Sequence, residues 1–184
     1  MAVNVKTEDR PPIVETSSNH QQFTELFHLY KDRTYDFALR MLGDAHAAGD
    51  VAQDVFIRLY EHQSNHHHIE DVKSWLFIVT RNLCLNHMRN RGRQVPLDAL
   101  DDQLAQTNPA VDPRQRALRR ALATLESPYR EALILKVYQG FAYIEIAEIL
   151  GTTVPAVRAI LFKARNQLRD ELNRTQAKGD SYEL

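Results

Sequence analysis

The chain has 184 residues, which leaves room for one large domain or two small ones and excludes a large multidomain enzyme. Its six glycines are fewer than half of an average share, which argues against a glycine-rich nucleotide-binding loop. The hydrophobic fraction of 43 % is ordinary, so we expect a globular and mostly helical protein. The formal net charge of −1 hides an arginine bias, because 17 of the 23 basic residues are arginine, a side chain suited to phosphate and guanine.

The first 20 residues are polar and show no helical period, so we expect a disordered lead over residues 1–20. They lack the apolar core of a signal peptide, and the longest apolar runs are too short to span a bilayer. The single cysteine, Cys84, excludes an intrachain disulfide and fits a reducing compartment. A cytoplasmic protein without membrane insertion is the expected outcome.

A first helical domain is predicted over residues 21–92. Apolar residues recur at three-and-four spacing from Phe23 to a stop at Gly43, and again in a second helix whose other face is acidic. A third helix is predicted to begin near Asp71, as its N-cap, and to run to about Arg91. These helices form one small bundle.

Residues 93–113 have the composition of a linker. The stretch from 94 to 113 holds three prolines and four aspartates and no basic residue. Two domains are therefore expected on either side of it, in an all-α fold.

The second domain is predicted over residues 114–172, followed by a polar tail over 173–184. Ser127 and Pro128 are expected to start a helix that ends at Gly140, followed by two short helices with a turn at Gly151. Small Ala147 lets those two helices approach, and Gly151 permits the backbone angles of the turn. This pattern predicts a helix-turn-helix, a common DNA-binding motif.

Two helices present basic surfaces without acidic residues. In the second helix of the helix-turn-helix the outward residues include Arg158, Phe162, Lys163 and Arg165, and the alternative is a merely solvated basic helix. The segment from Arg81 to 93 carries four arginines together with amide side chains. Arginines bind phosphates, amides read base edges, and the indole of Trp75 can stack on an unpaired base or pack in the core.

Catalytic and metal chemistry find no support in the sequence. Four histidines could supply metal ligands, namely His62, His66, His67 and His68. No cysteine or carboxylate completes a metal site with them. Cys84 has no base partner and is expected to be packing. We therefore expect a binding protein with no cofactor and no metal.

Three segments in order resemble the extracytoplasmic-function group of the sigma-seventy family, the minimal sigma factors of bacterial RNA polymerase. They are Gly49 to Tyr60, Trp75 to Arg89, and Leu125 to Leu168. The first is similar to the region that docks on the clamp of the polymerase, the second to the helix that opens the minus-ten promoter element, and the third to the region that reads the minus-thirty-five element.

The resemblance implies three sets of site residues. The set expected at the polymerase clamp is Asp50, Gln53, Asp54 and Phe56. The set expected at melted minus-ten DNA is Trp75, Asn82, Asn86 and Arg89. The set expected at minus-thirty-five DNA is Thr153, Arg158, Phe162, Lys163 and Arg165. The resemblance also implies contact with the polymerase flap, an anti-sigma factor as partner, and nucleoid association or sequestration at the inner membrane.

The recognition helix departs from the family pattern at Ala156, Ala159 and Ile160, which replace polar groups, so promoter bases cannot be carried over. The competing interpretations are a stand-alone helix-turn-helix regulator and a nucleic-acid enzyme such as a recombinase.

Overall fold

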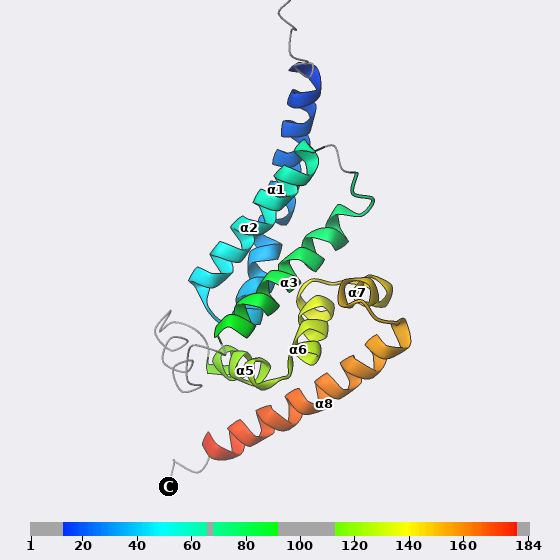
Figure 1. Cartoon of the computed structure of the whole chain (residues 1–184). Helices are drawn as coiled ribbons and strands as arrows, with labels where there is room; N and C mark the ends of the chain where they lie inside the picture. The colour runs from blue at the N-terminus through cyan, green and yellow to red at the C-terminus, as the bar shows by residue number, and fades with distance from the viewer. Residues whose placement is uncertain (1–12, 66–67, 92–112, 180–184) are drawn as a thin grey trace, which may run out of the picture.

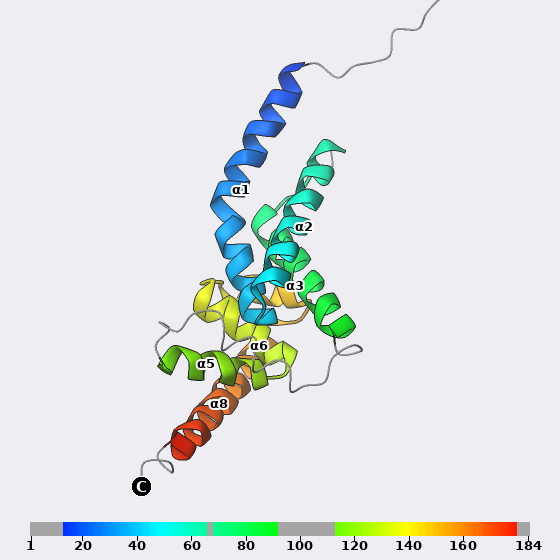
Figure 2. The same ribbon diagram turned by 90° about the vertical axis from the view of Figure 1, so that its left-hand side faces the viewer.

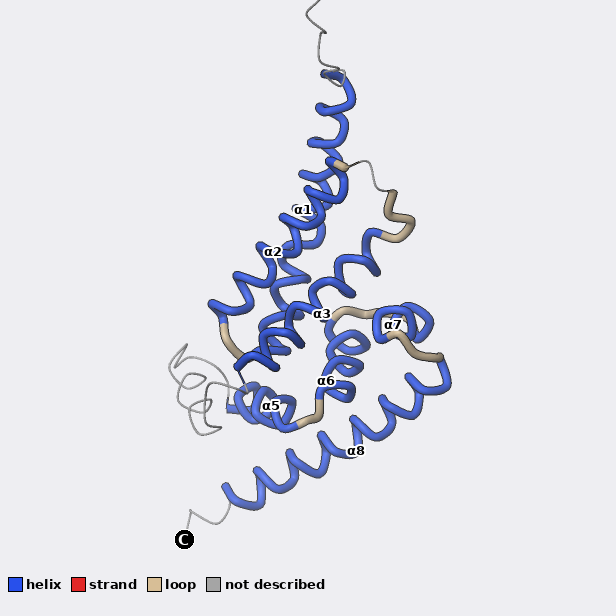
Figure 3. Tube along the Cα trace, viewed as in Figure 1, coloured by secondary structure: helices blue, strands red, loops and turns tan. Residues whose placement is uncertain are grey.

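The computed structural model describes residues 13–65, 68–91 and 113–179, and this part of the chain is helical without a strand (Figures 1 and 3). The helices, in chain order, are α1 (Ile13–Leu42), α2 (Ala45–Ser64), α3 (Val72–Arg91), α5 (Pro113–Thr124), α6 (Ser127–Leu133), the π-helical turn η1 (Ile134–Tyr138), α7 (Tyr143–Leu150) and α8 (Val154–Gly179). None of the described helices is long and apolar enough to cross a lipid bilayer.

Helices α1, α2 and α3 form an upper lobe, and the N-terminal turns of α1 project beyond the end of α2 (Figure 2). Gly43 ends α1 with a φ of 69°, and Asp44 then caps α2 by accepting hydrogen bonds from the amides of His46 at 2.9 Å and Ala47 at 3.1 Å. The predicted cap of α3 is confirmed, because Asp71 accepts from the amide of Ser74 at 3.1 Å.

Helices α5 to α8 form a lower lobe, in which α8 runs across the bottom of the molecule (Figure 1). The predicted turns are confirmed, since Gly140 and Gly151 have φ values of 72° and 65°. Gly151 in the left-handed conformation ends α7 and turns the chain into α8. Ala147 and Val157 are buried at the junction, as the helix-turn-helix pattern requires.

Three local boundaries differ from those expected. Helix α1 already begins at Ile13, inside the expected lead, and α8 is long and continues to Gly179, into the expected tail. Ser127 does not cap α6, because its hydroxyl instead donates to the carboxylate of Glu131. Both helix extensions are polar in sequence and give no hydrophobic period from which a helix could be predicted.

The two lobes pack directly against each other and share one hydrophobic core. Phe77 of α3 and Phe141 after η1 are fully buried and meet edge to face, with ring centroids 4.8 Å apart. Arg130 of α6 reaches across and donates to the carbonyl of Met41, at the end of α1, at 2.9 Å. The predicted linker lies mostly outside the described residues, but the domains it separates are in contact.

Candidate functional surfaces

The helix-turn-helix places a basic face on the surface of α8. Thr153 caps this helix, because its hydroxyl accepts from the amide of Ala156 at 3.4 Å. The apolar side of the helix is buried at Val157, Leu161 and Ala164. The predicted contact residues Arg158, Phe162, Lys163 and Arg165 are all exposed.

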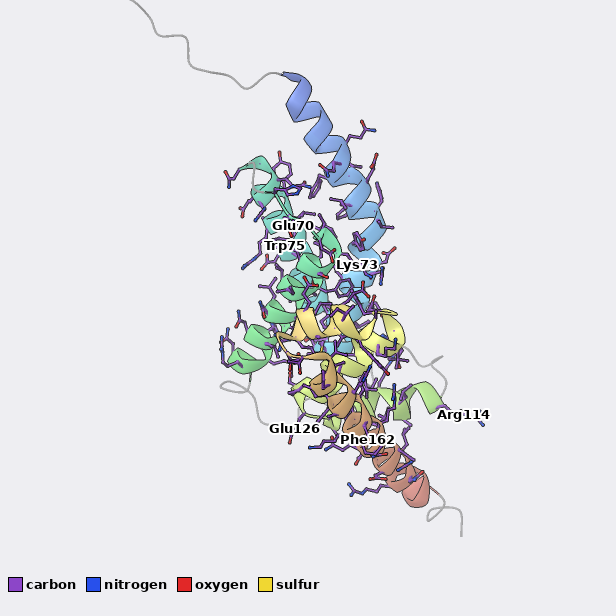
Figure 4. All side chains as sticks on the ribbon, turned by 90° about the vertical axis from the view of Figure 1, so that its right-hand side faces the viewer. Glu70, Lys73, Trp75, Arg114, Glu126 and Phe162 are labelled. Carbon is purple, nitrogen blue, oxygen red and sulfur yellow. The ribbon has the colours of Figure 1, made fainter. Side chains whose placement is uncertain are left out.

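Phe162 is a large apolar side chain in the middle of this basic face. It is 67 % exposed, and Figure 4 shows it on α8, away from the upper lobe. An aromatic ring among cations can contact a thymine methyl group or the edge of a base pair. The face therefore offers both phosphate-binding and base-contacting groups.

On α3, one side carries the predicted amide and guanidinium groups. Asn82, Asn86 and Arg89 are exposed, and the guanidinium of Arg89 donates to the amide oxygen of Asn86 at 2.5 Å. Trp75 precedes Asn82 by about two helical turns, which places it on the same side of α3. It is half-buried, with its ring edge-on to His62 at a centroid distance of 5.5 Å, so the indole is partly packed and partly accessible.

Another side of α3 faces the lower lobe, which the sequence did not reveal. Lys73, Phe77 and Arg81 are spaced by four residues and form one stripe. The Lys73 ammonium lies 2.5 Å from a carboxylate oxygen of Glu145, and the Arg81 guanidinium donates to Glu131 at 2.5 Å. Lys73 and Glu145 are 72 positions apart in the sequence, and Arg81 and Glu131 are 50 positions apart, so no local sequence pattern indicates these pairs.

The acidic face of α2 is exposed at Asp50, Gln53 and Asp54. Phe56, which was expected on this face, requires a correction: it is only 5 % exposed, and its ring packs edge to face on Phe27 at 4.9 Å. It supports the surface from the core and does not form it.

Two apolar residues that sequence reasoning missed lie on the surface of α2 instead. Ile57 is 46 % exposed and Tyr60 is 51 % exposed. Ile57 follows Gln53 and Asp54 at i+4 and i+3, so helical spacing could have placed it on the acidic face. Tyr60 lies against Phe23 of α1, with ring centroids 5.4 Å apart. Together these residues give α2 an exposed surface that is both acidic and apolar.

Hydrogen bonding and burial shift the pKa values of several groups near the junction of the two lobes. The hydrogen bond from Lys73 lowers the pKa of Glu145, and the hydrogen bond from Ser74 lowers the pKa of Asp71. Burial raises the pKa of the Cys84 thiol to about 12, with the negative charge of Glu131 adding to the effect. Cys84 is thus a neutral packing residue at physiological pH, as predicted.

Metal binding gains no positive support. Among residues 13–65, 68–91 and 113–179, no group of three or more histidine, cysteine or carboxylate side chains is arranged to hold a metal ion. His66 and His67 of the predicted histidine group lie outside the described residues.

The fold and these surfaces define a class of protein. An all-helical chain of two lobes, with a helix-turn-helix in one and an exposed arginine and amide face in the other, has the features of a DNA-binding protein. Comparison with known proteins narrows the class. The model for "Sigma-70 region 2" matches residues 26–94, and that for "Sigma-70, region 4" matches residues 115–168.

Characterised relatives give the same answer. ECF RNA polymerase sigma factor SigM of Bacillus subtilis is 32 % identical over 155 residues, covering 82 % of this chain and 94 % of the relative. ECF RNA polymerase sigma factor SigE of Mycolicibacterium smegmatis is 34 % identical over 158 residues, covering 80 % of this chain and 60 % of the relative. The chain belongs to the ECF RNA polymerase sigma factors, a family of transcription initiation factors and not of enzymes. The stand-alone regulator is not supported.

A solved structure shares the arrangement. The sigma factor RpoE in complex with the anti-sigma factor NepR from Bartonella quintana has a TM-score of 0.65 and 28 % identity, over 83 % of this chain and 98 % of that one. The predicted two-domain, all-α fold with a C-terminal helix-turn-helix is confirmed.

Proposed function

We propose that this chain binds core RNA polymerase through the exposed face of α2 and directs the polymerase to promoters by means of α3 and α8. The observation that carries the proposal is that each family-matched lobe presents its own exposed face of the expected chemistry. On α2 this face consists of Asp50, Gln53 and Asp54 with Ile57 beside them. Carboxylates at the rim of an apolar contact favour a basic partner surface, here that of the polymerase clamp.

Melted minus-ten DNA is assigned to α3. The amides of Asn82 and Asn86 contact exposed base edges, Arg89 binds a phosphate, and Trp75 stacks on an unpaired base. Trp75 is half-buried, with its ring against His62, so only part of the indole is available for such stacking.

Minus-thirty-five DNA is assigned to α8, whose cap residue Thr153 begins the recognition helix. Arg158, Phe162 and Lys163 enter the major groove, and Arg165 contacts a phosphate. Neighbouring surfaces of the lower lobe contact the polymerase flap.

An anti-sigma factor is proposed as the regulatory partner. The similar sigma factor RpoE from Bartonella quintana was crystallised in complex with the anti-sigma factor NepR. The chain is proposed to act in the cytoplasm at the nucleoid, and to be sequestered at the inner membrane when a membrane-bound anti-sigma factor holds it.

Run-off transcription tests the proposal. Purified core polymerase is supplied with genomic promoter fragments of the source organism, with and without this chain. Start sites that appear only with the chain support the proposal, whereas no start site and no co-elution with the polymerase would refute it.

Variants separate the surfaces in the same assay. Asp54→Arg is expected to abolish co-elution with the polymerase, because a cation replaces an anion at the centre of the acidic face. Asp32→Arg, the same change at an exposed position of α1, is the matched control and should co-elute normally. Arg158→Ala should co-elute normally but lose promoter selectivity.

A further inference from the structure

Asn86 and Arg89 form a hydrogen-bonded pair on the exposed side of α3. The guanidinium of Arg89 donates to the side-chain oxygen of Asn86 at 2.5 Å, and both residues are exposed. A guanidinium has only N–H donors and no acceptor, so the atom of the Asn86 amide that faces Arg89 must be its oxygen. Because the amide is planar, its NH2 group then lies on the side away from Arg89. The pair thus determines which end of the amide is offered to a ligand.

The partner of Arg89 is a neutral amide and not a carboxylate. Arg81, on another side of the same helix, donates to the carboxylate of Glu131. No acidic residue occurs between positions 81 and 91, and the residue three positions before Arg89 is Asn86. A carboxylate at this position would neutralise the guanidinium and repel a phosphate, whereas an amide orients the guanidinium and leaves its charge intact. Arg89 therefore keeps its charge and its other N–H groups for an anion.

A phosphate bound to Arg89 would hold the pair in place. On a helix surface, a hydrogen bond between side chains three residues apart is weak, since both side chains move in water. A phosphate oxygen that binds the guanidinium restricts the side chain of Arg89, and the amide of Asn86 is then restricted with it. The backbone contact and the base contact on α3 are therefore coupled, because one arginine binds the strand and orients the amide beside it.

The orientation of the amide determines which bases it can select. An asparagine that reads adenine accepts from N6 with its oxygen and donates to N7 with its nitrogen. With the oxygen of Asn86 engaged by Arg89, the side chain offers its NH2 donors. Guanine O6 and thymine O4 are acceptors for such a donor, whereas adenine N6 and cytosine N4 are themselves donors. The pair therefore favours a base with a carbonyl group over a base with an amino group.

We propose that Arg89 is a positioning residue for base selection: it holds the amide of Asn86 with the NH2 group outward, so that Asn86 selects guanine or thymine in the melted minus-ten strand. The inference rests on the proposed function, in which Asn86 contacts a base and Arg89 a phosphate. It adds that this arginine also determines specificity, whereas a phosphate contact alone carries no sequence information. Asn82, one turn earlier on the same side, has Leu85 at the corresponding position and no arginine there to orient it.

Selection from a pool of promoter fragments tests the proposal. Holoenzyme, formed from core polymerase and the full chain, is mixed with fork-junction fragments whose minus-ten element is a randomised single-stranded overhang. Sequencing of the bound and unbound fragments gives the base preference at every position. The position read by Asn86 is the one at which Asn86→Ala loses the preference. There the wild type should prefer guanine or thymine over adenine or cytosine by about fivefold, the discrimination that one hydrogen bond supplies.

Two variants distinguish orientation from simple charge. Arg89→Ala should weaken binding to all fragments and also abolish the preference at the Asn86 position. Asn86→Asp offers only acceptor oxygens and can still pair with Arg89, so its preference should reverse to adenine or cytosine. Arg169→Ala is the matched control and should leave the preference unchanged, since Arg169 likewise donates to the asparagine three residues before it, Asn166, at 3.2 Å on α8. Far-UV circular dichroism verifies that each variant is folded.

The outcomes separate this inference from the proposed function. An Arg89→Ala chain that binds all fragments more weakly but keeps the preference at the Asn86 position would overturn the inference alone, because the arginine would then be a phosphate contact only. A wild-type preference for adenine or cytosine at that position, or an Asn86→Asp chain that keeps the wild-type preference, would also overturn it. If Asn86→Ala changes the preference at no position, or the holoenzyme binds none of the fragments, the proposed role of α3 fails and the inference fails with it.

Discussion

The two helices assigned to DNA are built into the molecule in different ways. Helix α8 buries one side in its own lobe and leaves the rest to solvent, whereas α3 gives one side to its own bundle, one to the lower lobe and one to solvent. Consequently a change on the exposed side of α8 should affect DNA binding alone. A change on α3, or on what packs against it, should affect the association of the lobes as well.

The largest effect is expected for Phe141→Ala, which removes the ring between the lobes. Phe141 is fully buried, so the substitution should lower the free energy of unfolding by about 3 kcal/mol in urea titrations. The two lobes should then unfold in separate transitions, because the apolar centre of the junction is lost. Phe162→Ala on the exposed side of α8 is the matched control. A decrease of more than about 0.5 kcal/mol in its free energy of unfolding would contradict the claim that this side of α8 does not stabilise the fold.

A smaller loss is expected for Gly151→Ala, which acts on the turn between α7 and α8. An added methyl group meets no atom within 4 Å, so the cost comes only from the φ of 65° and should be about 1 to 2 kcal/mol. Gly49→Ala in the second turn of α2 has equally open surroundings and should instead stabilise the chain by about 0.5 to 1 kcal/mol. Thermal unfolding of both variants measures the difference, and the same sign for both would contradict this explanation.

The exposed side of α8 should respond in DNA affinity and leave stability unchanged. Arg165→Ala removes one phosphate-contacting cation. The logarithm of the promoter binding constant of holoenzyme, plotted against the logarithm of salt concentration, should therefore have a slope about 0.9 less steep. The urea midpoint should stay at the wild-type value. A shifted midpoint with an unchanged salt slope would place Arg165 in the fold and not at DNA.

The smallest expected effect is the pH dependence of the stability that the Lys73–Glu145 pair contributes at the junction of the lobes. Because the pKa of Glu145 is lowered in the folded chain, its pair with Lys73 stabilises the fold above the ordinary carboxyl pKa of 4.5 and is lost as pH falls below it. The difference in unfolding free energy between wild type and Glu145→Gln should therefore be constant from pH 7 to about 5.5 and shrink at lower pH. A difference that stays constant down to pH 3 would show that the charge of Glu145 does not contribute.

Features fixed by local chemistry were predictable from the sequence, and contacts between distant segments were not. Gly151 specifies the turn of the helix-turn-helix locally, and the structure has it in the expected left-handed conformation, with Thr153 capping the helix that follows. The pairing of Lys73 with Glu145 depends on how two complete lobes meet, which no local pattern encodes. Phe56 is an intermediate case: its helix was predicted correctly, but the resemblance placed the residue at the clamp surface, whereas its ring is buried against Phe27.

Footprinting of an initiation complex tests most directly the claim that α3 and α8 act at separate promoter elements. Holoenzyme is formed with Asn86→Ala or with Arg158→Ala, and each complex is probed with permanganate for unpaired thymines and with DNase I for duplex protection. Asn86→Ala is expected to reduce thymine reactivity at the minus-ten element and to keep protection at the minus-thirty-five element. Arg158→Ala is expected to weaken the protection at the minus-thirty-five element. Equal loss at both elements with either variant would contradict it.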